Sequence, residues 1–431
     1  MTITFIGHGY VGLVTACVFA DFGSDVWVVG RTPEKIEKLK KGDPLIYEPG
    51  LKELLQKNLH ANRLHFTLDY DRAIPTSDIV FITVGTPPKE NGEADLSTVF
   101  HVTEKVGKHL KKGFTVVSCK STVPVGTNLE VEKILNTVKP AHAEVAVASC
   151  PEFLREGTGI YDTLNPDRVV IGSHSQKAIE IILEVHKPLG GERVITDLAS
   201  AEIIKYASNA MLATKISFAN LISLYAEKTG GNIEMIMDAV GYDKRIGLRF
   251  LDAGIGYGGS CFPKDVMALI STGQQIGVDT SLLDAVEEIN REVQNNFIEK
   301  VKKNVNGKNI AIWGLSFKPN TDDIRFAPSL YIIKNLLQDG YHITAYDPAA
   351  MENVRRILKY QINYAGDPYE AANGADALCV LTEWNEFMQA DLLKVKAHLK
   401  VPLIIDGRNI YQPNMLKNLG FTYISTGRKS L

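Results

Sequence analysis

The stretch Ile3-Thr4-Phe5-Ile6-Gly7-His8-Gly9-Tyr10-Val11-Gly12 carries most of the information about the fold of this chain. Residues with strand propensity lead directly into a G-x-G-x-x-G turn. An apolar segment with helical spacing follows over Leu13–Phe22, and a second strand is predicted over Asp25–Val29. A glycine turn alone is weak evidence, and the alternative is a turn in some other α/β protein. The order strand, glycine turn, helix and strand is typical of a dinucleotide-binding Rossmann fold.

Each glycine of this turn has a physical reason. Gly7 allows the tight turn, Gly9 lets a pyrophosphate approach the backbone, and Gly12 allows the helix to pack closely on the strand. The amides at the helix start, those of Tyr10 and Val11 among them, would then hold the pyrophosphate. The turn therefore predicts a dinucleotide site.

Three further strands are predicted over residues 78–84, 115–118 and 144–148. Each is a nearly continuous apolar run, as expected for a parallel sheet that is covered on both faces. Polar or glycine-bearing loops follow them, over residues 85–88, 120–124 and 150–156. Because ligands of open α/β sheets bind outside the carboxyl ends of the strands, we expect these loops to line the site. Ordinary turns are the alternative.

Residues 201–228 are predicted to form one long helix with apolar residues on more than one side. Helical patterns continue over 233–240 and 282–301. Such a helix suggests a linker between domains that also packs against a second subunit, and a core helix buried within one chain is the alternative. Lys205 and Asn209 lie four residues apart on it, so they share a face and could present an ammonium and an amide to a substrate oxygen.

An alternation of strands and helices begins again near residue 307. Strands are predicted over 309–314, 342–347, 377–381 and 402–406, with a helix over 329–339. This order repeats the opening unit, but the second and third glycines of the turn are missing. We interpret the segment as a second nucleotide-sized α/β domain that is not itself a dinucleotide site. Its strand ends carry Lys318, Arg325 and Arg408, which suit a phosphate or diphosphate, although solvated surface cations are the alternative.

These patterns place the chain in the α/β class and predict three domains. An N-terminal Rossmann-type domain covers 1–199, a central helical domain covers 200–304, and a C-terminal Rossmann-like domain covers 305–431. The net charge of -3, without blocks of like charge, gives no indication of a nucleic-acid or membrane surface. No apolar run has the length of a spanning helix and no signal peptide opens the chain, so a cytoplasmic protein is expected.

The five cysteines are scattered without metal-ligand spacing, so neither a metal site nor a structural disulfide is predicted. Cys261 differs from the others because glycines crowd the stretch before it, Gly256-Tyr257-Gly258-Gly259-Ser260. Pro263 favours a helix start directly after it. A helix N-terminus and the nearby Lys264 both stabilise a thiolate. Cys261 is therefore a candidate nucleophile, with an inert buried cysteine as the alternative.

Several motifs together resemble those of the UDP-glucose/GDP-mannose dehydrogenase family, over nearly the whole chain. These motifs are the turn at 7–12, Val84-Gly85-Thr86-Pro87-Pro88, Ser121-Thr122-Val123-Pro124-Val125-Gly126-Thr127, residues 151–157, the Lys205/Asn209 helix, residues 256–265 and residues 314–325. The segment Arg245-Ile246-Gly247-Leu248-Arg249-Phe250-Leu251 resembles the UDP-glucose branch more than the GDP-mannose branch.

The resemblance implies a four-electron oxidation of UDP-glucose to UDP-glucuronate, with two NAD(P)⁺ and water, in a homodimer that forms through the central helix. Cys261 would add to the aldehyde that the first oxidation leaves. A second oxidation would convert the thiohemiacetal into a thioester, which water hydrolyses. Covalent capture would keep the aldehyde bound between the two oxidations.

The same resemblance implies a role for each site residue. Lys205 and Asn209 would stabilise the developing oxyanion. Asp265 and Thr122 would hold or activate a water, and Glu152 would be the base for hydrolysis. The residues implied for the substrate are Glu152, Phe153, Leu154, Arg155, Glu156, Lys205, Asn209, Arg245, Phe250, Leu251, Tyr257, Gly258, Lys318 and Arg408. Those implied for the cofactor, besides the glycine turn, are Gly30, Arg31, Thr32, Lys35, Thr86, Thr122, Glu156, Lys264 and Arg325.

One position departs from the family pattern. At the end of the second strand, where relatives carry an acidic residue for the adenosine ribose, this chain has Gly30-Arg31-Thr32. Gly30 removes a carboxylate that would repel a 2′-phosphate and opens space there. Arg31 supplies a guanidinium that suits the phosphate. NADP is therefore favoured over NAD, the family default.

Three other functions are kept as alternatives. A related nucleotide-sugar 6-dehydrogenase would act on GDP-mannose or a UDP-hexosamine. A two-electron dehydrogenase of the hydroxyacid type shares the domain order but has no use for Cys261. A non-catalytic nucleotide-sensing protein would need neither Cys261 nor Lys205. The number of cofactors reduced per sugar nucleotide separates a 6-dehydrogenase from the other two classes: two, one or none.

Overall fold

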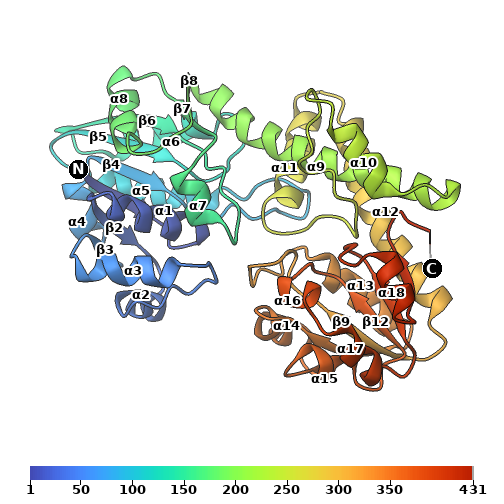
Figure 1. Ribbon diagram of the computed structural model, residues 1–431. Coiled ribbons are helices and arrows are strands. Elements are labelled where there is room, and N and C mark those ends of the chain that lie inside the picture. Colours follow the sequence, from blue (N-terminus) through green and yellow to red (C-terminus); the bar gives the residue numbers. More distant parts are fainter. Residues whose placement is uncertain (430–431) are drawn as a thin grey trace. The chain divides into compact units, whose positions relative to one another are not determined.

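The computed structural model describes residues 1–429 and divides them into two compact units (Figure 1). The first unit holds Met1–Ser208 and Met267–Ile276, and the second holds Asn209–Val266 and the chain from Gly277 onward. The boundaries of the three domains predicted from the sequence stay a prediction.

The first unit is built on an eight-stranded sheet. Its strands are β1 (Thr2–Ile6), β2 (Asp25–Val29), β3 (Leu64–Thr67), β4 (Ile79–Ile82), β5 (Gly113–Cys119), β6 (Ala143–Ser149), β7 (Arg168–Gly172) and β8 (Glu192–Thr196). The order in the sheet is β3-β2-β1-β4-β5-β6-β7-β8, and every neighbouring pair is parallel except β6 and β7. The first six strands thus follow the order of a dinucleotide-binding fold, as predicted.

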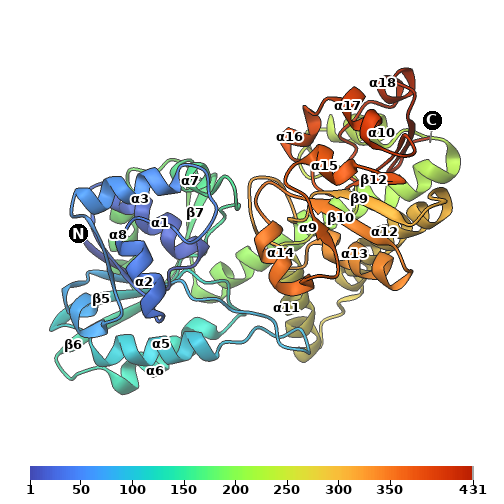
Figure 2. The ribbon, with the colours of Figure 1, turned by 90° about the horizontal axis from the view of Figure 1, so that it is seen from below.

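Helices cover both faces of this sheet (Figure 2). One apolar layer joins the strands to α1 (Tyr10–Asp21), α3 (Leu51–His60) and α8 (Gln176–Val185). The other joins them to α5 (Ser97–Lys108) and α6 (Thr127–Val138). The remaining short helices are α2 (Pro33–Lys40), α4 (Tyr70–Ala73), η1 (Ile74–Thr76) and α7 (Gly159–Leu164). Burial on both faces explains why the strands read as continuous apolar runs.

The second unit contains a six-stranded, fully parallel sheet. Its strands are β9 (Asn309–Trp313), β10 (His342–Tyr346), β11 (Asn363–Tyr364), β12 (Ala377–Val380), β13 (Leu403–Asp406) and β14 (Thr422–Ser425). They lie in the order β11-β10-β9-β12-β13-β14, which repeats the order of the first six strands of the chain. The predicted α/β class and the internal repeat are therefore confirmed.

The helices of this second sheet also form two layers. One apolar layer includes α13 (Pro328–Gln338) and α14 (Met351–Leu358), together with part of α12. The other includes α15 (Pro368–Ala372), α16 (Asn385–Met388), α17 (Leu392–His398) and α18 (Pro413–Asn418). The helices of the middle of the chain are α9 (Leu198–Thr229), α10 (Ile233–Gly241), α11 (Phe262–Gln275) and α12 (Ser281–Asn304). The single long helix predicted over 201–228 is α9.

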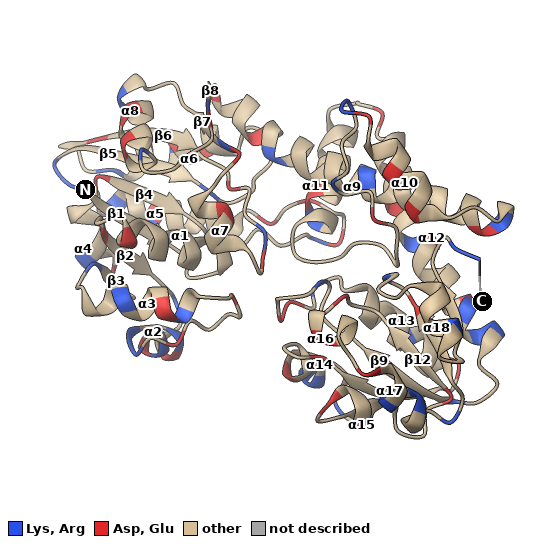
Figure 3. Ribbon diagram, in the orientation of Figure 1, with Lys and Arg blue, Asp and Glu red and all other residues tan. Residues whose placement is uncertain are grey.

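Charged residues of both signs are interspersed along the helices and loops (Figure 3). This distribution agrees with the small net charge of -3. Within residues 1–429, no helix combines the length and the apolar character that a membrane span requires.

Both sheets use the same close contact at the end of their first strand. Gly7 (φ +117°) follows β1, and a Cβ there would lie 2.7 Å from the backbone oxygen of Thr83, which follows β4. Gly314 (φ +98°) follows β9, and a Cβ there would lie 2.5 Å from the Cβ of Thr382, beyond β12. Since a side chain would be both strained and obstructed, glycine is required at each position.

Gly12 completes the first of these contacts. A Cβ on Gly12 would lie 2.2 Å from the backbone oxygen of Gly7 and 2.5 Å from Oγ1 of Thr83. A Cβ on Gly9, by contrast, would have no neighbour within 4 Å. Gly7 therefore serves the tight turn and Gly12 the packing of α1, as predicted. Gly9 leaves the backbone open, which its predicted contact with a pyrophosphate requires, and that contact stays a prediction.

We expect Gly12→Ala to lower the free energy of unfolding by about 1–3 kcal/mol, because the methyl group would overlap backbone that cannot retreat. Gly9→Ala is the matched control, and it should change that free energy by less than about 0.5 kcal/mol. Urea unfolding followed by far-UV circular dichroism measures both. Equal losses for the two variants would contradict the assignment of the packing contact to Gly12 rather than to Gly9.

Candidate functional site

The start of α1 is open to an anion. Gly9 is its N-cap residue, no side chain caps the helix, and its first turn contains no acidic residue. Tyr10 and Val11 are the first two residues of the helix. Amides at a helix start attract negative charge, so this turn suits a pyrophosphate.

The end of β2 corrects one prediction from the sequence. Gly30 does not open space, because a Cβ there would lie 2.5 Å from Cδ1 of Ile36 and 2.8 Å from Cδ2 of His8. Arg31 and Lys35 are exposed nearby. Burial lowers the pKa of His8, and the charges of Lys35 and Arg31 lower it further. The two cations thus lie close enough to the turn to act on it electrostatically.

Thr32 lies just beyond Arg31. It is the N-cap residue of α2, although its side chain does not cap that helix.

The loops after β4 and β5 meet through two threonines. Oγ1 of Thr86 donates a hydrogen bond of 2.9 Å to the backbone oxygen of Thr122. The second loop is also held by Glu202 of α9, whose carboxylate accepts hydrogen bonds of 2.8 Å from the backbone amides of Gly126 and Asn128. Burial raises the pKa of Glu202, and these hydrogen bonds oppose the shift. Thr122 therefore lies in a loop that α9 anchors.

Glu152 and Lys205 form a buried ion pair. Oε1 of Glu152 lies 3.0 Å from Nζ of Lys205, and both side chains are less than a tenth exposed. The other oxygen of Glu152 accepts a hydrogen bond of 2.7 Å from the amide of Leu154. The ring of Phe153 lies under two cations, with the guanidinium of Arg168 at 3.9 Å and the ammonium of Lys205 at 5.3 Å from its centroid. The carboxyl edge of the sheet thus brings a carboxylate and an ammonium together in a dry environment.

Ion pairs and hydrogen bonds also hold residues 155–157 of this loop in place. Arg155 forms an ion pair with Asp162, with Nη2 and Oδ1 2.6 Å apart, so its guanidinium stabilises the loop itself. Glu156 is buried. The amide of Gly157 donates hydrogen bonds of 2.7 Å to the hydroxyl of Tyr10 and to the carboxylate of Glu48. Tyr10 thus connects the glycine turn to the loop that carries Glu152.

Cys261 directly precedes α11, the position that the sequence predicted. It is partly exposed, whereas the other four cysteines are buried. Asp265, in the first turn of α11, is buried and accepts a hydrogen bond of 2.5 Å from Nδ2 of Asn209. Asp265 also forms an ion pair with Lys264. Cys261 therefore lies beside a helix start at which a carboxylate, an ammonium and an amide are already joined.

The glycine stretch before Cys261 is closely packed. A Cβ on Gly258 would lie 2.3 Å from the backbone oxygen of Phe326. Tyr257 and Leu251 are buried, and Phe250 adopts a positive φ of 66°. Arg245 is exposed and pairs with Asp243.

The cations of the C-terminal strand ends have different surroundings. Arg408 donates hydrogen bonds of 3.0, 3.1 and 3.4 Å to the backbone oxygens of Leu381, Gly256 and Phe317. It therefore ties the glycine stretch to the sheet. Lys318 lies 5.4 Å from the ring centroid of Phe317. Arg325 pairs with Asp323, and their charged atoms lie 2.7 Å apart.

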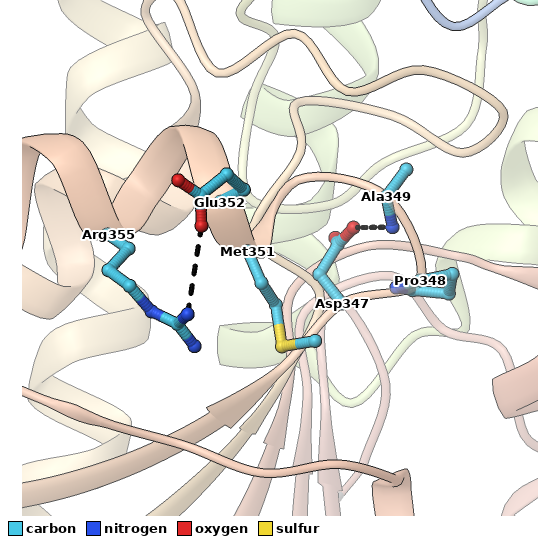
Figure 4. Close-up of a pocket in the computed structure, with 6 residues that line it drawn as sticks. All are labelled: Asp347, Pro348, Ala349, Met351, Glu352 and Arg355. Carbon is cyan, nitrogen blue, oxygen red and sulfur yellow. Dashed lines mark hydrogen bonds and ion pairs between the residues drawn. The ribbon is translucent and has the colours of Figure 1, made fainter.

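A pocket at the end of β10 shows how the second sheet differs from the first (Figure 4). It is lined by Asp347, Pro348, Ala349, Met351, Glu352 and Arg355. Asp347 occupies the place that follows the second strand of the repeat. One of its oxygens accepts hydrogen bonds of 2.7 and 3.0 Å from the amides of Leu315 and Ser316, in the turn after β9. The Asp347 carboxylate is thus hydrogen-bonded to the turn amides that a pyrophosphate would need. This contact supports the interpretation that the domain is not a dinucleotide site.

The sequence did not single out four of the residues that hold these loops in place: Glu48, Arg168, Glu202 and Asn290. Each acts on a segment distant in the sequence, as Glu48 does on Gly157. Only Glu202 had a local signal, because it lies one helical turn before Lys205 on the predicted long helix.

Family models match the chain along most of its length. The model described as the NAD binding domain of the UDP-glucose/GDP-mannose dehydrogenase family matches residues 1–190. Its central domain matches residues 199–292, and its UDP binding domain matches residues 311–413.

Individual relatives are similar over their full length. The chain is 46% identical to UDP-glucose 6-dehydrogenase of Rhizobium meliloti (strain 1021), an alignment that covers 99% of this chain and 100% of the relative. It is also 46% identical to UDP-glucose 6-dehydrogenase TuaD of Bacillus subtilis (strain 168), with 100% and 94% covered. The structure of a UDP-glucose dehydrogenase from Pyrobaculum islandicum superimposes with a TM-score of 0.93 at 34% identity, over 99% and 98% of the two chains. The chain belongs to the UDP-glucose/GDP-mannose dehydrogenase family.

Proposed function

We propose that this protein oxidises UDP-glucose to UDP-glucuronate, using two dinucleotides and one water per sugar. The observation that carries the proposal is the partly exposed Cys261 at the start of α11, beside the buried Asp265 and Asn209. A two-electron dehydrogenase would have no use for such a thiol. Full-length relatives at 46% identity that are named UDP-glucose 6-dehydrogenase support the same activity.

The residues of the first unit fit a dinucleotide. The start of α1 is uncapped by side chains, and the backbone at Gly9 is open. We propose that this turn holds the pyrophosphate and that Arg31 and Lys35 face the adenosine. When bound, the nicotinamide supplies the hydride acceptor for both oxidations, first of the C6 alcohol and then of the thiohemiacetal.

Cys261 is the proposed nucleophile. Its thiolate forms a bond to C6 of the aldehyde, and the electron pair of the carbonyl bond moves to the oxygen. After the second oxidation, water attacks the resulting thioester, the C–S bond breaks, and the thiolate leaves. The start of α11 favours the thiolate in both steps, because the partial positive charge of the helix stabilises an anion there.

The neighbouring polar residues supply the remaining chemistry. We propose that Lys205 and Asn209, one helical turn apart on α9, donate hydrogen bonds to the oxygen on which negative charge develops. Glu152, whose carboxylate forms an ion pair with Lys205, accepts the proton of the attacking water. Asp265 and Thr122 orient that water.

The uridine diphosphate would bind in the second unit. Lys318 is the proposed diphosphate ligand. The sequence suggested a substrate-binding role for Arg408. Its hydrogen bonds to three backbone oxygens support a different main role, which is to hold the glycine stretch in place. Phe250, Leu251, Tyr257 and Gly258 would shape the sugar site. The cytoplasmic location expected from the sequence stays a prediction.

We expect Cys261→Ser to form no UDP-glucuronate above about a thousandth of the wild-type rate, because a serine hydroxyl is far less ionised than a thiol. The measurement is the amount of reduced cofactor and of acid per UDP-glucose, which should be two and one for the wild type. Glu152→Gln is the companion variant, and it should accumulate an acyl adduct on Cys261 that intact-mass spectrometry detects. One reduced cofactor per sugar in the wild type would contradict the four-electron reaction.

We further propose that the enzyme prefers NADP to NAD. After the second strand this chain presents the exposed cations Arg31 and Lys35 and no carboxylate at Gly30. A charge-assisted contact to a 2′-phosphate contributes about 1.5–3 kcal/mol, or roughly a ten- to hundredfold preference. Because Ile36 and His8 fill the space at Gly30, a substitution of Gly30 would disturb packing as well as specificity.

Arg31→Ala therefore tests the preference more cleanly. We expect it to lower kcat/KM with NADP by about tenfold or more while kcat/KM with NAD stays within about twofold. Lys38→Ala, which removes another exposed cation of the same region, is the control and should leave the ratio unchanged. Equal wild-type efficiency with both cofactors, or higher efficiency with NAD, would refute the proposal.

We also propose that the protein forms a homodimer through α9. Met211, Phe218 and Tyr225 recur every seven residues on this helix and are 61%, 47% and 62% exposed. Residues at this spacing lie on one face, so the helix presents an apolar stripe rather than a fully buried core surface. Exposed apolar stripes of this kind mark association surfaces.

The double variant Phe218→Asp/Tyr225→Asp should sediment as a monomer in analytical ultracentrifugation, because two carboxylates would be desolvated in the interface. Tyr360→Asp is the control, since Tyr360 is fully exposed on a different part of the second unit, and this variant should sediment like the wild type. A wild type that sediments as a single chain, or a double variant that remains dimeric, would exclude α9 as the interface.

A further inference from the structure

Asn290 of α12 binds both backbone groups of Tyr257. Its Oδ1 accepts a hydrogen bond of 2.8 Å from the Tyr257 amide, and its Nδ2 donates one of 3.2 Å to the Tyr257 oxygen. Asn290 is 8% exposed and Tyr257 is 6% exposed. The side-chain amide thus pairs with this stretch of backbone as a neighbouring strand would, because it offers an acceptor and a donor at once.

The side chain of Tyr257 extends this connection towards the thiol. Its hydroxyl donates to the carboxylate of Glu287, which precedes Asn290 on α12. Its ring meets the ring of Phe262 edge to face, with centroids 5.9 Å apart and planes at 82°. Phe262 is the first residue of α11 and the neighbour of Cys261. A continuous set of contacts therefore runs from α12 through Tyr257 to the residue beside the thiol.

The fit between Asn290 and the glycine stretch is close. Gly256 adopts a φ of +85°, and a Cβ there would lie 2.4 Å from Oδ1 of Asn290. The same stretch is held at two other points, since Arg408 donates to the oxygen of Gly256 at 3.1 Å and the amide of Gly259 donates to the oxygen of Arg325 at 2.8 Å. Between Gly256 and Gly259, Asn290 holds the backbone of Tyr257 through its two hydrogen bonds.

We propose that Asn290 is a positioning residue for Cys261: by pairing with the backbone of Tyr257, it sets the place of the thiol at the start of α11. The inference rests on the proposed role of Cys261 as nucleophile. Asn290 does not act on the sugar itself. Its loss would leave a buried amide and a buried carbonyl of Tyr257 without their partner, and the glycine stretch would shift to satisfy them.

Asn290→Asp tests the contact with little change of shape. An ionised carboxylate still accepts a hydrogen bond from the Tyr257 amide. It cannot donate to the Tyr257 oxygen, so a carboxylate oxygen and this carbonyl oxygen, both acceptors, would face each other. A protonated carboxyl regains the donor. Charged groups around this position include Glu287 and its electrostatic partner Arg291 on α12, and Arg408 at Gly256, and all three are present in wild type and variant alike. The ratio of variant to wild type therefore isolates the introduced carboxyl.

The first readout is the rate at which iodoacetamide alkylates Cys261, followed by intact mass and peptide mapping. The other four cysteines are buried, so the reaction reports on this thiol. At about pH 8 we expect the alkylation rate of Asn290→Asp to differ from that of the wild type by at least about fivefold. Burial and the neighbouring Glu287 both raise the pKa of the introduced carboxyl, so the ratio of the two rates should move towards one as the pH falls to about 5.5. In turnover, kcat should fall about tenfold while KM for the sugar nucleotide stays within about threefold.

Two further variants complete the test. Asn290→Ala removes both hydrogen bonds without adding a charge, so its deficit should be the same at every pH. Asn295→Asp makes the same change of type at an exposed position on α12, where Asn295 accepts from the hydroxyl of Tyr331 at 2.8 Å. This control should match the wild type in both rates. If Asn290→Asp folds poorly, Asn290→Ala is compared with the wild type and with Asn295→Asp instead.

The proposal is overturned if folded Asn290 variants alkylate and turn over within about twofold of the wild type, or if the deficit of Asn290→Asp does not depend on pH. An increase in KM with unchanged kcat and alkylation would also overturn it, because Asn290 would then act on substrate binding. Alkylation requires no substrate. A wild type that fails to oxidise UDP-glucose would therefore contradict the proposed function and leave the alkylation result intact.

Discussion

Both sheets of this protein depend on one close contact. In each, a glycine directly after the first strand packs on a threonine that follows the fourth strand. Gly7 packs on Thr83 and Gly314 packs on Thr382, each with a positive φ that other residues adopt at a cost. The strand order reverses at this point in both sheets. A crevice outside the carboxyl ends of the strands follows from that reversal, and it is where ligands of open α/β sheets bind.

The two sheets differ in what occupies the amides of the turn. In the second sheet Asp347 accepts hydrogen bonds from Leu315 and Ser316, so the chain supplies its own anion. In the first sheet no side chain caps α1, and Gly9 leaves the backbone open. One topology is therefore used twice, but only the first copy retains the electrostatic conditions for a pyrophosphate. The two copies thus differ in local chemistry rather than in fold.

Two buried carboxylates among the candidate residues have a cationic partner. Glu152 lies 3.0 Å from Lys205, and Asp265 is bound by Lys264 and Asn209. An unpaired charge in such surroundings would be strongly unfavourable, and the partners offset part of the cost of burying each carboxylate. The low dielectric that makes pairing necessary also strengthens hydrogen bonds to charge that develops during a reaction.

The sequence alone was sufficient for features that depend on neighbouring residues. The glycine turn after β1, the long helix α9 and the helix start after Cys261 were predicted correctly, because propensity and periodicity are local properties. The short strands β3, β7 and β8 were not predicted, although β7 carries the β-branched run Val169-Val170-Ile171, because runs of four or five residues are too short to assign without their neighbours in the sheet.

Contacts between distant segments were decided only by the tertiary structure. Asn290 binds Tyr257 across 33 positions, and Glu48 binds Gly157 across 109. Gly30 illustrates the limit most clearly. A missing side chain suggested open space, yet folding places Ile36 and His8 there, because close-packed interiors leave few voids unfilled.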